Sequence, residues 1–305
     1  MRIRIALLLL LTALPLAAQT KRYRFQSNPW MNLHQRLLYE AQFDDPLPAA
    51  LDNPAWKDLV AQYRAYVRKR SPLDDQELLL IDAELSKAAD KLPVRIPAAA
   101  AKVLNAAMPL YQATQWPIDD RANRFWIAIA QTLVQQAGEE LAAAHAKVYG
   151  VPFPADILVD VTGDAWRFGA YTTGEGSFAH AIIASPVSGT QGFGALESLV
   201  HEPSHAIVDA RSGAIGADLA RLQRELNVKV YASLWHAILF YTSGELTRRA
   251  LAERGVTYRP FIENMYAGPF KGMREALETH WKAYLDGKIS REDALRKIVL
   301  ETAIK

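Results

Sequence analysis

The chain of 305 residues contains no cysteine, which excludes disulfide bonds and a lipid-modified cysteine as a membrane anchor. It also has no low-complexity tract, and no run of apolar residues beyond the N-terminus reaches the length of a membrane span. Half of its residues are hydrophobic, and a chain of this length can bury a core without disulfides. We therefore expect a globular protein of one large domain or two small ones.

Residues 1–18 have the order of a secretory signal peptide, with two arginines, an apolar run and small residues near Ala17 and Ala18. Removal of this segment takes away Arg2 and Arg4, so the 35 basic side chains fall by two and equal the 33 acidic ones. A neutral mature chain gives no electrostatic reason to expect nucleic acid as a partner. The sequence thus predicts a secreted or periplasmic protein with no stable membrane span after signal cleavage.

The remaining chain divides by its pattern into three regions. Residues 19–150 have apolar residues at helical spacing almost throughout, which predicts a helical N-terminal region. Residues 151–256 begin with strand-like stretches and continue with two helices, and residues 257–305 end the chain with further helices. The expected fold class is mainly α with a small antiparallel β-sheet, an α+β arrangement.

Three strand-like stretches occur in the middle region, at residues 157–161, 168–173 and 178–185. Gly174-Glu175-Gly176 separates the last two and predicts a hairpin. The sheet therefore lies directly before the stretch that carries the most chemical information in the chain.

That stretch is His201-Glu202-Pro203-Ser204-His205, which has the pattern H-E-x-x-H between apolar flanks. If residues 195–210 form a helix, His201 and His205 lie one turn apart on one face, and both can reach one Zn²⁺ at about 2.0–2.1 Å. Glu202 then lies beside this face and could take a proton from a metal-bound water. On these five residues and their flanks, the sequence resembles the zincin metallopeptidases.

Two neighbours of the motif bear on this interpretation. Pro203 removes a helical hydrogen bond between the two histidines and predicts a kink there, which could spoil the metal site. Asp209 follows His205 by four residues and could accept a hydrogen bond from the ring of a metal-binding histidine, which would orient that ring.

A catalytic zinc site needs a third protein ligand and one open position. Glu245 is the expected ligand, because its Gly-Glu setting after aromatic residues resembles the second-helix glutamate of the gluzincin branch. His236 is the alternative. Nine residues separate the two, so they lie on opposite sides of a continuous helix and cannot both bind one metal.

The resemblance further implies one zinc ion per chain, a peptide or protein substrate, and an edge strand that receives the substrate backbone. Residues 179–184 are the expected edge strand, with His180 as a candidate substrate contact. His34, near the start of a predicted helix, is a second candidate contact, and Tyr266 or His236 could act on the reacting groups. An ordinary packing role is the alternative for each of them.

Taken together, the sequence predicts an exported zinc-dependent hydrolase, most simply a peptidase, in which Glu202 activates water. The alternative is a catalytically silent zincin-like binding protein of the cell envelope, in which Pro203 has ended metal binding. A third alternative is an accidental motif in a helical core. The hydrolase requires a bound metal, whereas the silent binding protein and the accidental motif do not.

Overall fold

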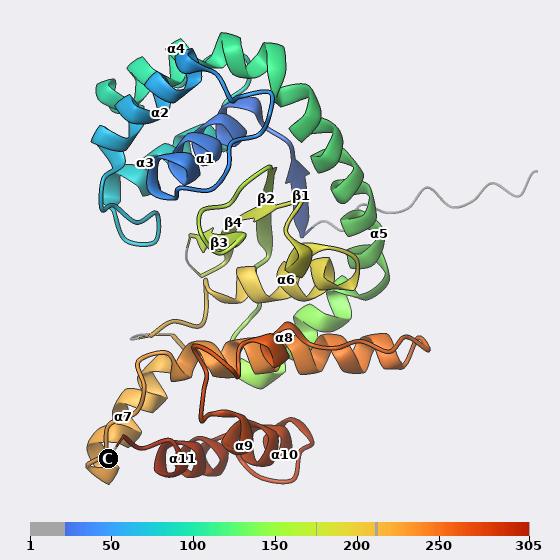
Figure 1. Ribbon diagram of the computed structural model, residues 1–305. Coiled ribbons are helices and arrows are strands. Elements are labelled where there is room, and N and C mark those ends of the chain that lie inside the picture. The colour runs from blue at the N-terminus through green and yellow to red at the C-terminus, as the bar shows by residue number, and fades with distance from the viewer. Residues whose placement is uncertain (1–21, 175, 211–212, 305) are drawn as a thin grey trace, which may run out of the picture.

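The computed structural model describes residues 22–174, 176–210 and 213–304 (Figure 1). The expected signal peptide lies outside the described residues. The chain is mainly helical with one small sheet, so the predicted α+β class is confirmed. Among the described residues, no helix is both long enough and apolar enough to cross a membrane.

The sheet has four strands in the order β1-β2-β4-β3. They are β1 (Tyr23–Gln26), β2 (Asp156–Thr162), β3 (Ala170–Thr173) and β4 (Phe178–Ala184). The hairpin between β3 and β4 is antiparallel as predicted, but β1 and β4 both run parallel to β2. The sheet is therefore mixed rather than antiparallel, and its first strand, β1, comes from the region expected to be only helical.

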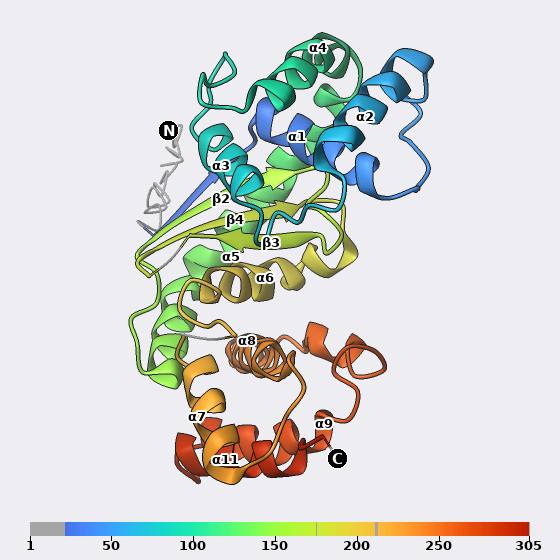
Figure 2. The same ribbon diagram turned by 90° about the vertical axis from the view of Figure 1, so that its left-hand side faces the viewer.

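Four helices cover one face of this sheet (Figure 2). They are α1 (Pro29–Gln42), α2 (Pro54–Val67), α3 (Gln76–Leu85) and α4 (Ala98–Thr114). Asn28 and Asp75 cap α1 and α3 with side-chain oxygens that accept backbone N–H groups, and Pro29 and Pro54 occupy first helical positions. The apolar side chains of this layer pack against Tyr171, Ile182 and Ala184 of the sheet.

The opposite face of the sheet packs on two helices, α5 (Trp116–Tyr149) and α6 (Phe193–Ser204). Alternate residues of β4 point to the two faces, so Ala179, Ala181 and Ile183 join this second core while Ile182 joins the first. A short 3₁₀ turn, η1 (Ser188–Thr190), precedes α6. The helix that carries the histidine motif thus lies directly beneath the sheet (Figure 2).

The C-terminal part packs below α6 around α8 (Leu234–Ala252) (Figure 1). Its other elements are α7 (Gly216–Leu226), η2 (Phe261–Asn264), α9 (Arg274–Ala276), the π-helical turn η3 (Leu277–Trp281), α10 (Lys282–Leu285) and α11 (Arg291–Glu301). Val148 and Tyr149, at the end of α5, belong to this third core. Helix α5 therefore spans from the sheet to the C-terminal helices.

A buried polar network ties the first helical layer to β3. The Tyr171 hydroxyl of β3 donates to Asp82 Oδ2 at 2.8 Å and receives a hydrogen bond from Gln35 Nε2 at 2.6 Å. Gln35 also donates to Asp82 Oδ1, and His34 Nε2 lies 3.3 Å from that oxygen. Since these groups are shielded from water, each bond counts for more than it would at the surface.

We predict that Tyr171→Phe destabilises the protein by about 1–3 kcal/mol, because Asp82 loses a buried donor and Gln35 loses an acceptor. Urea unfolding measures this change. Tyr231→Phe is the matched control, since Tyr231 is exposed and should change the free energy of unfolding by less than about 0.5 kcal/mol. Equal effects of the two substitutions would show that the network does not hold β3.

Candidate metal centre

Helix α6 ends earlier than the sequence suggested, at Ser204 rather than near residue 210. Pro203 therefore lies in the last turn, where few helical hydrogen bonds follow it. His205 occupies the cap position and keeps helical angles (φ −59°, ψ −24°). The rings of His201 and His205 consequently remain neighbours, with centroids 5.0 Å apart. The proline does not separate the two imidazoles.

His236 of α8 completes a group of three histidines. The ligand atoms of His201, His205 and His236 all lie within 4.8 Å of one another. His201 Nε2 and His236 Nε2 are 3.4 Å apart. Two nitrogens that bind one tetrahedral zinc at 2.0–2.1 Å would be about 3.3–3.4 Å apart, so this spacing fits a shared metal ion.

The protonation of the three histidines also fits metal binding. Burial lowers the pKa of His205 to about 3 and that of His236 to about 4, and burial with the neighbouring histidines holds the pKa of His201 well below its usual value. All three are thus neutral at pH 7, the state in which an imidazole nitrogen can bind a metal. His201 Nδ1 has no hydrogen-bond partner among the described residues, and the partner of its Nε2 is the Nε2 of His236.

The structure does not bring Glu245, the expected third ligand, to this group. Helix α8 is continuous through Ser243 and Gly244, so Glu245 lies on the side away from His236. Its two carboxylate oxygens accept hydrogen bonds from Arg248 and Arg249 at 2.7–2.8 Å. Burial alone would raise the pKa of Glu245, but these two arginines lower it below its usual value. The geometry favours His236, the alternative ligand.

Glu202 lies beside the histidines and is tied to β3. The Thr172 hydroxyl donates to Glu202 Oε2 at 2.8 Å, and only 7% of Glu202 is exposed. Burial raises the pKa of this carboxyl to about 7, although the Thr172 hydrogen bond acts in the opposite direction. A carboxyl group with a pKa near neutrality can both accept and return a proton.

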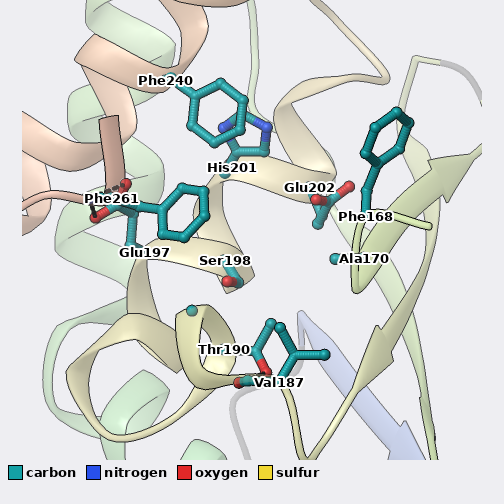
Figure 3. Close-up of a pocket in the computed structure, with 11 residues that line it drawn as sticks. Phe168, Ala170, Val187, Thr190, Glu197, Ser198, His201, Glu202, Phe240 and Phe261 are labelled. Atoms are coloured by element: carbon teal, nitrogen blue, oxygen red, sulfur yellow. Dashed lines mark hydrogen bonds between the residues drawn. The ribbon is translucent and has the colours of Figure 1, made fainter. Parts of the chain in front are cut away.

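A cavity of about 60 Å³ opens next to His201 and Glu202 (Figure 3). Its walls come from β3 and the residues before it, from η1, and from α6, α8 and η2. The lining residues are Phe168, Ala170, Val187, Gly189, Thr190, Glu197, Ser198, His201, Glu202, Phe240 and Phe261. Most of this wall is apolar, and the two carboxylates and His201 lie along its α6 side.

Glu197 is a site residue for which the sequence analysis proposed no role. It precedes His201 by one helical turn and is only 3% exposed. Its carboxylate accepts the Tyr258 hydroxyl at 2.6 Å and the Phe261 N–H at 3.1 and 3.2 Å, so it holds Phe261 in the cavity wall. Burial raises the pKa of Glu197 to about 7 against these hydrogen bonds. Its i, i+4 relation to His201 is a signal that the sequence did contain.

Two expected substrate contacts and the expected edge strand are wrong. His34 is fully buried and bonds the Tyr63 hydroxyl at 2.6 Å, within the first helical layer. His180 is 2% exposed and bonds Asp160 Oδ2 at 2.8 Å, on the sheet face opposite α6. β4, which contains residues 179–184, is an internal strand, and β3 lies at the edge of the sheet beside α6.

The structure also changes the setting of the two remaining candidates, Asp209 and Tyr266. Asp209 is in the non-helical segment after α6, so the helical spacing on which its expected role rested is absent. The ring of Tyr266 lies 5.1 Å from the Arg274 guanidinium, and Tyr266 does not line the cavity.

Comparison with known proteins gave no significant match to any family model, any curated protein or any solved structure. The resemblance to zincins therefore rests on the sequence motif alone.

We predict that His236→Ala abolishes stoichiometric zinc binding, because it leaves two ligands, whereas Glu245→Gln retains zinc. Elemental analysis of the purified proteins measures the metal content, with His201→Ala as the reference for loss. The opposite pattern, zinc lost in Glu245→Gln and kept in His236→Ala, would overturn the ligand assignment.

Glu197 should make the stability of the protein depend on pH. The folded-state pKa of this carboxyl lies near 7, above its unfolded value, so the folded protein holds the extra proton between about pH 4.5 and 7. Its contribution to stability is therefore present at low pH and is lost as the pH rises. Glu197→Gln removes this loss, so the stability of the variant relative to the parent should rise by roughly 1–3 kcal/mol from pH 5 to pH 8.

Urea unfolding of the parent and of Glu197→Gln at both pH values, in the presence of a chelator, measures this difference. Other buried carboxyls titrate equally in the two proteins and cancel. A difference in unfolding free energy that does not change with pH would contradict the assignment.

Proposed function

We propose that this protein is a zinc-dependent hydrolase that cleaves peptide bonds. The observation that carries the proposal is the convergence of three histidines, with ligand atoms within 4.8 Å, beside a buried glutamate that lines a cavity. Three imidazoles leave one position of a tetrahedral zinc open, which is typical of catalytic rather than structural zinc sites.

His201 of α6, His205 at the C-terminal cap of α6 and His236 of α8 would hold the metal. A zinc ion held in this way supplies Lewis acidity, since it polarises a carbonyl group and makes water acidic enough to lose a proton near neutral pH. The rings of Trp235 and Phe240 pack against these histidines and keep the site apolar. An apolar surrounding strengthens the electrostatic effects of the charged groups.

Glu202 acts as the general base and then as the general acid. Its carboxylate takes a proton from the attacking water and returns it to the leaving amine. Thr172 holds one of its oxygens by a hydrogen bond, which leaves the other oxygen for the proton. The carboxylate is thereby oriented by the same strand that bounds the cavity.

Two features support a peptide as the substrate. β3 is the last strand of the sheet and, among the described residues, pairs only with β4, so an extended backbone could add to its other edge. The adjacent cavity is lined by Phe168, Val187 and Phe261, and its 60 Å³ gives room for about four water-sized groups. We infer that it takes an apolar side chain of medium size next to the cleaved bond.

We predict that Glu202→Gln retains about one zinc per chain but lowers the turnover of peptides by roughly 10²–10⁴-fold, because Gln cannot transfer the proton. A fluorogenic peptide library provides the assay, and the matched control is Glu225→Gln on the exposed part of α7. Retained turnover in Glu202→Gln would contradict the role of this residue. A parent protein that binds no zinc at neutral pH would instead favour a silent binding protein built on the same scaffold.

A further inference from the structure

Pro203 leaves a gap in the hydrogen bonding of α6. A residue at position 203 would normally donate its N–H to the carbonyl oxygen of Leu199, and proline has no N–H. Leu199 is fully buried, so water cannot take the place of the missing donor. A buried carbonyl without a donor is costly, and helices tend to bend where the ladder is interrupted.

A residue from the other end of the chain fills this gap. The Tyr23 hydroxyl of β1 donates to the Leu199 carbonyl oxygen at 2.9 Å, across 176 positions of sequence. Tyr23 is 6% exposed, and its ring packs against Gly138 of α5 and beside Phe25. Burial raises the pKa of Tyr23, so the hydroxyl stays protonated and remains a donor.

Leu199 lies in the helical turn directly before His201. Ser204 Oγ donates to the Val200 carbonyl at 2.7 Å, and the His205 N–H donates to the Glu202 carbonyl at 3.0 Å. These bonds close the end of α6 after Pro203, but neither reaches Leu199. The Tyr23 hydroxyl thus donates to the Leu199 carbonyl oxygen, which Pro203 cannot do, and ties the helical turn before His201 to β1.

We propose that Tyr23 is a positioning residue for the metal site, whose hydroxyl replaces the missing amide of Pro203 and holds His201 and His205 in register with His236. This inference rests on the proposed metal site. The position of β1 beside α6 thereby compensates for the proline in the motif.

A double-mutant cycle tests this dependence. Zinc affinity, measured by competition with a fluorescent chelator, is compared in the parent, Tyr23→Phe, Pro203→Ala and the double variant. Tyr23→Phe should weaken zinc binding roughly tenfold in the parent background. In the Pro203→Ala background the amide of residue 203 is present, so the same change should weaken binding less than about threefold.

The matched control is Tyr111→Phe, which removes a buried hydroxyl bond of 2.7 Å between Tyr111 of α4 and Asp119 of α5. It should lower the thermal midpoint by roughly 2–6 °C, as Tyr23→Phe does, but leave zinc affinity unchanged. Equal weakening by Tyr23→Phe in both backgrounds, or none in either, would overturn the role of Tyr23 while the metal site stands. A parent protein without zinc would overturn the proposed function together with this role.

Discussion

The contact between α6 and α8 is the constraint on which the site depends. A motif on a single helix supplies two imidazoles, and a third must come from a separate element at a fixed distance. Helix α8 crosses beneath α6 so that His236 Nε2 lies 3.4 Å from His201 Nε2. Gly244 contributes to this close packing, since a Cβ at that position would lie 3.2 Å from Glu197 Oε1 and 2.6 Å from Pro260. The apolar stripes of both helices are buried on either side of the contact.

The layers above the site act on it through β3. Thr172 lies on the sheet face that packs on α6 and donates a hydrogen bond to Glu202. Tyr171 lies on the opposite face and bonds Asp82 and Gln35 of the N-terminal helices. Adjacent residues of a strand point to opposite faces, so one short strand connects the N-terminal helices to the proposed general base. The helical N-terminal region is therefore part of the support of the cleft.

The sequence predicted the features that depend on local pattern. The helical regions, the β3–β4 hairpin and the placing of His201, Glu202 and His205 together follow from periodicity and from spacing on one helix. The parallel pairing of β1 with β2 could not be predicted in this way, because β1 has only four residues and each pairs with a residue 134 positions further on. The same limit applies to β4, whose internal position is set by how the strands pair rather than by its own composition.

The choice between Glu245 and His236 needed information about neighbours in space. Both residues lie on one helix, and spacing alone allowed either to face α6. Arg248 and Arg249 exclude Glu245 as the ligand, because they bind its carboxylate on the side of α8 that faces away from His236. Likewise, Pro203 suggested a broken motif, whereas the end of α6 at Ser204 and the hydroxyl of Tyr23 accommodate it.

The most direct test of the central claim is X-ray absorption spectroscopy at the zinc edge of the zinc-loaded protein. We expect three imidazole nitrogens and one further light ligand at about 2.0–2.1 Å. A zinc environment with two imidazoles and a protein carboxylate, or the absence of bound zinc, would contradict it.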